Sequence, residues 1–216
     1  MTWRNKLEKR LGWLRIPNLM NLIVGGMALV WLCDLLLPAL RLSGLISLNM
    51  AQVARGQIWR LLTFVFVPPS GSMLTLVLGL YFYWMIGSAL EGRWGAGRFT
   101  RYYAVGMLGA VLAACITGYG SNAFLNLSMF FAFAALWPDF QVMLFFILPV
   151  KIKYLALLDA ALYVWQLIVG GWPTRLAIVF SLLNLILFMG GDLLRTLRQE
   201  SHYWKTRRNF RSAMRK

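Results

Sequence analysis

Residues 73–89 read MLTLVLGLYFYWMIGSA, a run without a single charge, and this stretch sets the class of the fold. A helix needs about 20 predominantly apolar residues to cross the hydrocarbon core of a bilayer, and fewer where the bilayer is thin. The run starts directly after Pro68-Pro69-Ser70-Gly71, a turn-forming sequence that gives it a defined beginning. The sequence therefore predicts a transmembrane helix over Met73–Ala89.

Five further segments share this composition, and most of them end at proline or glycine. They are Asn21–Leu37, Tyr102–Thr117, the short Ala123–Trp137, Tyr154–Val169 and Leu176–Leu194. The whole chain of 216 residues is 60% hydrophobic and 13% charged, whereas a soluble domain carries about 25% charged residues. We predict an all-α membrane protein with six spans. Phe140–Val150 is apolar but too short to span, so we expect an interfacial or re-entrant segment.

The net charge of +15 follows from basic residues that flank the apolar spans instead of interleaving with aromatic residues, which argues against nucleic-acid binding. All but four of the 22 lysines and arginines fall on one predicted side, so we expect both termini to be cytoplasmic. The predicted regions are an interfacial amphipathic segment (1–18), a membrane domain (19–195) and a basic cytoplasmic tail (196–216), which could contact a cytoplasmic partner. We expect a bacterial plasma membrane, or the endoplasmic reticulum membrane in a eukaryote.

The residues of the spans offer no general base for a hydroxyl nucleophile. The only histidine, His202, lies in the basic tail, outside every apolar segment. A serine needs a neighbouring base to become a nucleophile, and histidine is the usual one. The two cysteines, Cys33 and Cys115, form no metal-binding or redox pair, so we predict neither a metal nor another cofactor.

The first loop, which connects the spans Asn21–Leu37 and Met73–Ala89, is unusually long, and its segment Ala51–Val67 mixes apolar residues with arginines. We expect it to lie sideways in the outer interface of the membrane. Trp59 is suited to anchor it there, and Arg60 to reach lipid headgroups or backbone carbonyls, with Gln57 beginning the same motif.

Four ordered motifs resemble the rhomboid superfamily. They are Gln57–Thr63 (QIWRLLT), Gly87–Gly95 (GSALEGRWG), Leu148–Ala156 (LPVKIKYLA) and the pair Gly190-Gly191. The resemblance covers about residues 20–195. It implies a compact rhomboid-like bundle of six transmembrane helices with a long membrane-embedded first loop, a locally thinned bilayer, and clients that are transmembrane helices.

The chain departs from the protease pattern of that family at each active-site position. In the region of the Gly-x-Ser-Gly motif it has Ser121, Asn122 and Ala123, and Phe188 stands where the histidine before Gly190-Gly191 is expected. The positions of the oxyanion-supporting histidine and asparagine fall at Thr75 and Gly79.

These losses make the chain most similar to the non-proteolytic, Derlin-like branch, and the turn at Pro68-Pro69 favours a bacterial member. The resemblance then implies a pseudoprotease that binds transmembrane clients and aids their quality control or movement. A serine protease with a degenerate site, using Ser121 with unconventional help, is an alternative.

Polar residues within the spans are the remaining candidates. Asn126, Ser128 and Asn184 could bind a client helix or simply join helices by hydrogen bonds. Asp34 and Asp159 are acids at membrane depth, which are costly there and are functional candidates by default. We expect a solvated or hydrogen-bonded carboxyl for Asp34, and protonation or a polar partner for Asp159. Together the two acids leave open a small transporter that handles protons or lipids.

Overall fold

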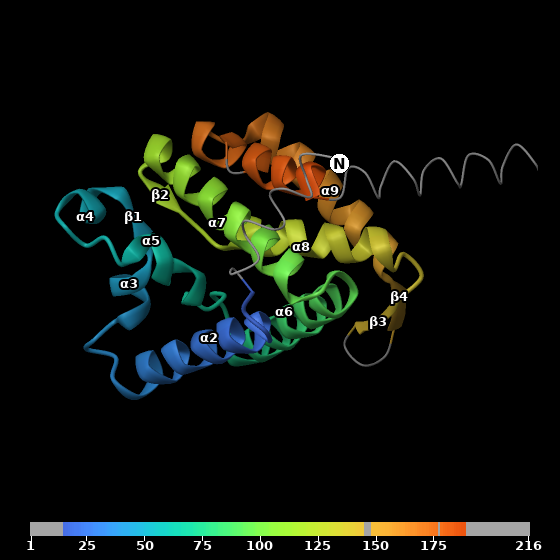
Figure 1. Ribbon diagram of the computed structural model, residues 1–216, viewed down its shortest axis with the longest axis horizontal. Helices are drawn as coiled ribbons and strands as arrows, with labels where there is room; N and C mark the ends of the chain where they lie inside the picture. Colours follow the sequence, from blue (N-terminus) through green and yellow to red (C-terminus); the bar gives the residue numbers. More distant parts are fainter. Residues whose placement is uncertain (1–14, 145–147, 177, 189–216) are drawn as a thin grey trace, which may run out of the picture.

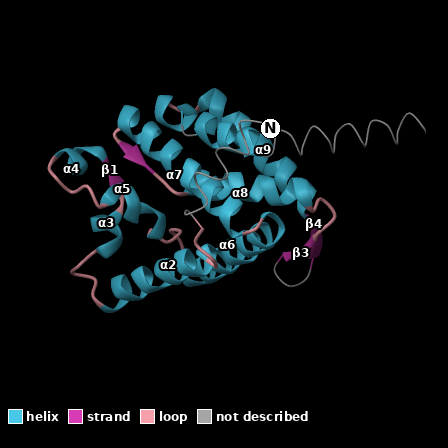
Figure 2. Cartoon of the chain, in the orientation of Figure 1, coloured by secondary structure: helices cyan, strands magenta, loops and turns pink. Residues whose placement is uncertain are grey.

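The computed structural model describes residues 15–144, 148–176 and 178–188, and these are mostly helical (Figures 1 and 2). A described helix lies on each of the six predicted spans. These helices are α2 (Leu19–Leu36), α6 (Met73–Trp94), α7 (Ala96–Thr117), α8 (Ala123–Leu136), α9 (Ile152–Val169) and, as the last described helix, Trp172–Phe188. Within the described part of the chain, four of them, α2, α6, α7 and α9, are long and apolar enough to cross a membrane.

Shorter elements connect these helices. They are α3 (Leu42–Ile46), β1 (Leu48–Asn49), α4 (Met50–Ala54), α5 (Arg60–Thr63), the 3-10 helix η1 (Phe64–Phe66), β2 (Tyr119–Gly120), β3 (Gln141–Leu144) and β4 (Leu148–Lys151). The strands form two small antiparallel pairs, β1 with β2 and β3 with β4. The predicted segment 1–18 lies largely outside the described residues, and the tail 196–216 and Gly190-Gly191 lie wholly outside them.

The boundaries of α6 and α7 have local causes. The Ser72 hydroxyl caps α6 by accepting a hydrogen bond from the backbone N–H of Thr75. A single residue, Gly95, separates α6 from α7, and Gly118 ends α7 with a φ of 86°, a left-handed conformation that favours glycine. Both helices therefore extend beyond the apolar runs that predicted them, to Trp94 and back to Ala96.

Helix α8 lies in the interior, between α6, α7 and α9 (Figure 1). The residues from Leu125 to Met129 are all buried, so this helix is covered on every side near its start. Its 14 residues rise about 21 Å, less than the roughly 30 Å of a hydrocarbon core. Because neighbouring helices surround it, α8 does not have to match the thickness of the bilayer.

The outer helices expose large apolar side chains over most of their length. Examples are Leu29 on α2, Val77 on α6, Leu112 on α7 and Trp165 on α9. The basic residues lie at helix ends instead: Arg93 and Arg98 flank the α6–α7 junction, and Arg55 precedes the other end of α6. Apolar sides with charged ends are what an integral membrane protein presents to lipid and water.

Arg60 joins separate parts of the first loop by hydrogen bonds. Its side chain is only 5% exposed, and its Nη1 atom donates to the carbonyl oxygens of Gly44 (2.8 Å) and Ser47 (2.7 Å). Its Nε atom donates to Oε1 of Gln57 at 2.7 Å. Of the two predicted roles for Arg60, the contact with backbone carbonyls is therefore the one that forms. Trp59 is 52% exposed on the outside of this loop.

The loop is built largely of short helices, α3, α4, α5 and η1. Strand β1 pairs with β2, which places Leu48 opposite Gly120. A side chain at Gly120 would collide with Leu48, so the glycine permits this pairing. The first loop is thus joined to the connection between α7 and α8, a contact between segments far apart in the sequence.

The segment predicted to be interfacial or re-entrant, Phe140–Val150, contains the β3–β4 hairpin. The open edges of a two-stranded hairpin leave backbone groups unpaired, which hydrocarbon does not tolerate, so this segment suits an interface and not the membrane interior. At its base, Lys151 and Lys153 both donate to Asp139, at 3.0 and 3.2 Å. These hydrogen bonds, that of Lys151 first, hold the pKa of the Asp139 carboxyl below its ordinary value.

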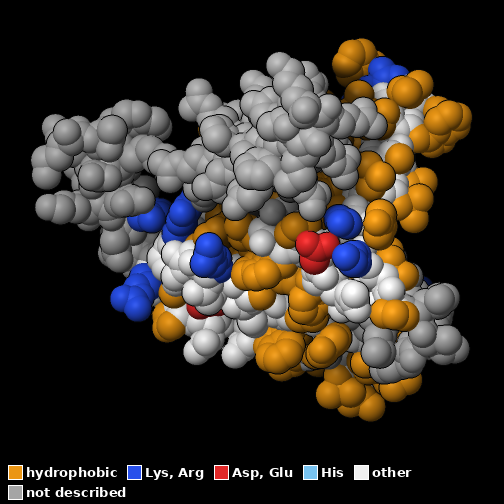
Figure 3. All heavy atoms as spheres, turned by 90° about the vertical axis from the view of Figure 1, so that its right-hand side faces the viewer, with side chains coloured by type: hydrophobic (Ala, Val, Ile, Leu, Met, Phe, Trp, Pro, Cys, Tyr) orange, Lys and Arg blue, Asp and Glu red, His pale blue; other side chains and the backbone are white. Residues whose placement is uncertain are grey.

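Figure 3 shows the end of the molecule from which this hairpin projects, with charged side chains gathered among hydrophobic ones.

Candidate functional site

A cavity of about 200 Å³ lies between α7, the start of α8 and the last described helix. Apolar and hydroxyl or amide side chains line it together. The lining residues are Gly106, Ala110, Ala113, Tyr119, Gly120, Ser121, Leu125, Ser128, Pro173, Thr174, Phe180, Ser181 and Asn184. Among these described residues there is no acid, histidine or amine, so the cavity offers hydrogen bonds but no group suited to take a proton from a hydroxyl.

Small residues on α7 make room for the cavity. Gly106, Ala110 and Ala113 follow one another at helical spacing and form one wall. A β-carbon at Gly106 would lie 2.8 Å from Nδ2 of Asn184 and 3.3 Å from Leu125, so the absence of a side chain there sets the distance between the helices. The sequence reveals these small residues, but not which neighbour they face.

Ser121 and Asn122 both tie the start of α8 to its surroundings. The Ser121 hydroxyl accepts a hydrogen bond from the backbone N–H of Ala123 at 3.1 Å. The Asn122 amide donates to the carbonyl oxygens of Val65 and Val67, at 3.2 and 2.8 Å. These contacts fix α8 to η1, so the region of the family's nucleophile motif is occupied here by structural hydrogen bonds.

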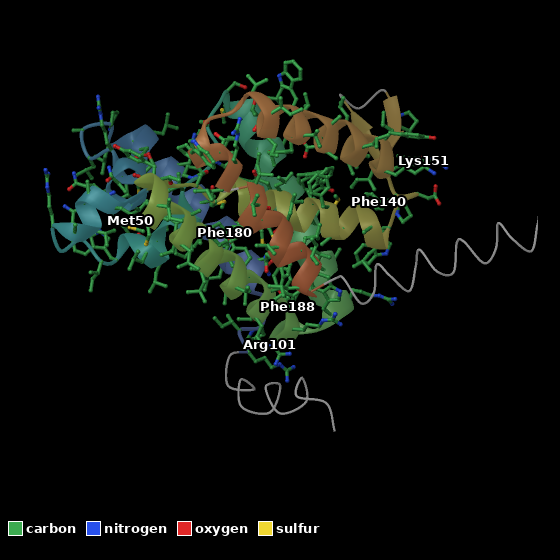
Figure 4. The ribbon with its side chains drawn as sticks, turned by 90° about the horizontal axis from the view of Figure 1, so that it is seen from above. Met50, Arg101, Phe140, Lys151, Phe180 and Phe188 are labelled. Carbon is green, nitrogen blue, oxygen red and sulfur yellow. The ribbon has the colours of Figure 1, made fainter. Side chains whose placement is uncertain are left out.

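Ser121 and Phe188 lie at opposite ends of the last described helix. Ser121 shares the cavity with Pro173 and Thr174, at the beginning of that helix. Phe188 lies at its other end, close to Arg101 in Figure 4, and its carbonyl accepts a hydrogen bond from Arg98 at 3.2 Å. The helix between them rises about 24 Å. The structure therefore does not bring these two predicted positions together.

Thr75 and Gly79 belong to the first turns of α6 and do not line the cavity. The Thr75 hydroxyl is 3.0 Å from that of Ser72. Gly79 faces Pro69, whose Cγ would be 3.3 Å from a β-carbon at that position. Both residues thus contact the turn that precedes α6.

A hydrogen-bond chain joins α7, α8 and the last described helix at the inner end of the cavity. The Tyr102 hydroxyl donates to Ser128 Oγ at 2.7 Å, and Ser128 in turn donates to the carbonyl of Leu125 at 2.8 Å. Asn184 Nδ2 donates to the carbonyl of Tyr102 at 3.4 Å. The Ser128 proton is thus committed to a backbone carbonyl, whereas Oδ1 of Asn184 is buried without a hydrogen-bond partner.

Asn126 is the least satisfied polar side chain of the described interior. It is 4% exposed, and neither its Nδ2 nor its Oδ1 has a hydrogen-bond partner. The hydroxyl of Tyr83 on α6 lies beside it, without a hydrogen bond that meets ordinary geometry. The hydroxyl of Tyr103 is likewise buried and unpartnered. Groups of this kind cost about 1–3 kcal/mol each, so their presence calls for an explanation.

The two intramembrane acids differ in their surroundings. Asp34 accepts hydrogen bonds from the backbone N–H of Leu42 and from the Ser43 side chain and N–H, which joins the end of α2 to α3. This is the hydrogen-bonded carboxyl expected for Asp34. Asp159 is half-buried in the middle of α9, with Tyr163 as its polar neighbour.

The sequence reasoning missed several polar members of this region. Tyr102 and Tyr103 passed as ordinary span residues, and Thr174 and Ser181 were not singled out. The available signal was the spacing of Ser181 and Asn184, three residues apart and so on one face of a helix. Tyr102 carried no such signal, because its partner Ser128 comes from α8.

Comparison with protein-family models, with curated proteins and with solved structures finds no match to this chain.

Replacing Asn126 with leucine is expected to stabilise the protein by about 1–2 kcal/mol, because a buried amide without a partner gives way to an apolar side chain of similar volume. The measurement is unfolding in mild detergent, followed by tryptophan fluorescence. Ser128→Ala is the matched control on the same helix, and it should destabilise the protein by about 1 kcal/mol because the Tyr102 hydroxyl loses its acceptor. A loss of stability in Asn126→Leu would mean that the amide has a bound partner.

Proposed function

We propose that this chain is a rhomboid-like membrane protein without protease activity, which binds transmembrane helices of client proteins and aids their quality control or movement. In this proposal the six helices form one bundle in the membrane, with both termini in the cytoplasm. The proposal combines the ordered motifs of the sequence with the polar interior of the bundle.

The observation that carries the proposal is the set of buried hydrogen-bonding groups that the protein itself leaves unsatisfied. Asn126 has both amide atoms free, and Asn184 has a free oxygen beside the cavity. A client span with polar or weakly hydrophobic residues gains hydrogen bonds from such groups, and hydrocarbon cannot supply them. Unsatisfied buried groups lower the stability of the protein, and a client that binds them would offset that cost.

The chemistry of the cavity supports binding without cleavage. The Ser121 and Ser128 hydroxyls are engaged with backbone groups, and the described lining holds no base that could activate them. The chain's one histidine lies in the basic tail, beyond the predicted spans. A serine hydroxyl at its resting pKa is a poor nucleophile.

The packing of α9 supports a lateral entrance beside it. Ile152 at its start is its only fully buried residue, and the helix contacts chiefly α8 and β4. On α6, Phe82 packs against Phe130 of α8, with ring centroids 6.0 Å apart. A client helix could therefore approach α8 between α6 and α9, and it would reach the buried Asn126 by displacing α9.

Photo-crosslinking tests the proposal. A photoreactive residue at Leu78 of α6, one turn before Phe82, or at Leu162 of α9, is expected to capture membrane proteins through their spans. The control is Val77, which is also exposed but lies two turns before Trp84 on the α6 face that meets α2. Equal capture at Leu78 and Val77, or no capture above background, contradicts the proposal.

The captured clients also test the absence of cleavage. They are expected to stay intact on incubation in liposomes, and Ser121→Ala and Ser128→Ala should leave this result unchanged. A shortened product that disappears in either serine variant would replace the proposal with an intramembrane protease.

A further inference from the structure

One face of α9 is polar at membrane depth. Ile152, Ala156, Asp159, Tyr163 and Gln166 follow at intervals of three or four residues, so they share one side of the helix. Ile152 is fully buried and Ala156 packs against the core, so the first turns of this side face the bundle, whereas Gln166 at its far end is exposed. Asp159 therefore points to the boundary between the bundle and the lipid, and not into lipid alone.

The Asp159 carboxyl has a polar neighbour but no cation. Tyr163, one turn further along α9, is half-buried on the same side of the helix.

The nearest cations along the chain are committed elsewhere. Lys153 and Lys151 donate to Asp139, and Lys153 also lies 5.5 Å from the Tyr154 ring. Lys153 precedes Asp159 by six residues, which puts it on a different side of α9. Arg175, beyond the far end of α9, donates to the Ile168 carbonyl at 2.8 Å. In the described part of the chain Asp159 thus makes no ion pair.

We infer that Asp159 binds a lysine or arginine side chain that a client helix carries at membrane depth, with the hydroxyl of Tyr163 on the same face of α9 completing the site. This inference rests on the proposed function and names the class of client that it favours. A cation and an acid are each costly within hydrocarbon, and pairing them across two helices removes much of both costs. Long basic side chains also reach several ångströms along a helix, which relaxes the depth at which the client residue has to sit.

The test uses the purified full-length protein in liposomes and designed transmembrane peptides with fluorescent labels. One peptide is a leucine-alanine helix with a single central lysine, a second has leucine at that position, and a third has aspartate. Energy transfer reports binding. The wild-type protein should bind the lysine peptide about tenfold more tightly than the leucine peptide, because only the lysine peptide can form an ion pair with Asp159.

Asp159→Asn preserves the size of the side chain, and it should reduce binding of the lysine peptide to the level of the leucine peptide. Asp139→Asn removes an exposed acid outside the spans and is the matched control; it should change nothing. Asp159→Lys should shift the preference to the aspartate peptide. Tryptophan fluorescence checks that each variant is folded.

The outcomes separate this inference from the proposed function. If every peptide binds equally, and Asp159→Asn binds them as the wild type does, Asp159 has no role in selecting clients. The proposed binding of clients would not be affected by that result. If no peptide binds while the crosslinking at Leu78 also fails, the proposed function itself is lost. An equal loss of lysine-peptide binding in Asp139→Asn would assign the effect to surface charge and overturn the inference.

Discussion

Arg60→Ala is expected to lower the free energy of unfolding by about 3 kcal/mol, because the variant loses charge-assisted hydrogen bonds from a nearly buried guanidinium. Nη1 of Arg60 bridges the carbonyls of Gly44 and Ser47, and Nε holds Gln57. Those partners belong to α3 and to the turn before α5. Without Arg60 the first loop should detach from β1, and with it from the start of α8.

Two further variants make the Arg60 prediction specific. Arg55→Ala removes an exposed arginine from the same loop and should change stability by less than about 0.5 kcal/mol. Arg60→Lys should not restore stability, since an ammonium group lacks the planar fork that reaches two carbonyls and Gln57 at once. Unfolding in mild detergent, followed by circular dichroism, measures all three. If Arg60→Ala and Arg55→Ala behave alike, the loop is held by other contacts.

Gly87→Ala is expected to destabilise the protein by about 1–3 kcal/mol through overpacking between α6 and α2. A β-carbon at Gly87 would lie 2.6 Å from the Met20 sulfur, and Met20 is fully buried, so its side chain has nowhere to move. The added methyl group should force α2 away from α6. The same detergent unfolding assay measures the effect.

Gly92→Ala is the matched control on the same helix. Nothing lies within 4 Å of a β-carbon at Gly92, so alanine should stabilise α6 by up to about 1 kcal/mol through lower backbone entropy in the unfolded chain. Combining Gly87→Ala with Met20→Ala should cost less than the sum of the two single variants, because the smaller residue at position 20 makes room for the new methyl group. An equal response of Gly87→Ala and Gly92→Ala would show that α2 and α6 do not pack closely.

The positions of the helices were predictable from the sequence because long apolar runs leave little choice. Within hydrocarbon each backbone N–H and C=O needs an internal partner, and a helix provides one from its own segment. The predicted Met73–Ala89 is the core of α6, and Tyr102–Thr117 is the greater part of α7. The ends of these two helices were harder to predict. A single residue, Gly95, separates Trp94 at the end of α6 from Ala96 at the start of α7.

The candidate site was only partly predictable. Asn126, Ser128 and Asn184 stood out as polar residues in apolar spans, and all three are buried together in the bundle. The sequence did not reveal how these side chains are hydrogen-bonded, because the partner of Ser128 is Tyr102 on another helix, α7. The sequence shows Phe140–Val150 only as a short apolar run, whereas the structure depends there on the pairing of β3 with β4.

The sequence by itself determined that this protein is helical, with apolar helices long enough to span a membrane, where those helices lie, and that histidine is missing from its apolar runs, since composition and period decide these properties locally. Only the tertiary structure decided that Arg60 holds backbone carbonyls, that Ser121 and Phe188 lie far apart, and that, among the described residues, Asn126 has no hydrogen-bond partner and Asp159 no ion pair. Each of these depends on which helix faces which, and helix contacts join residues that are distant in the chain. Whether a polar group inside a membrane is satisfied is a property of the packed bundle.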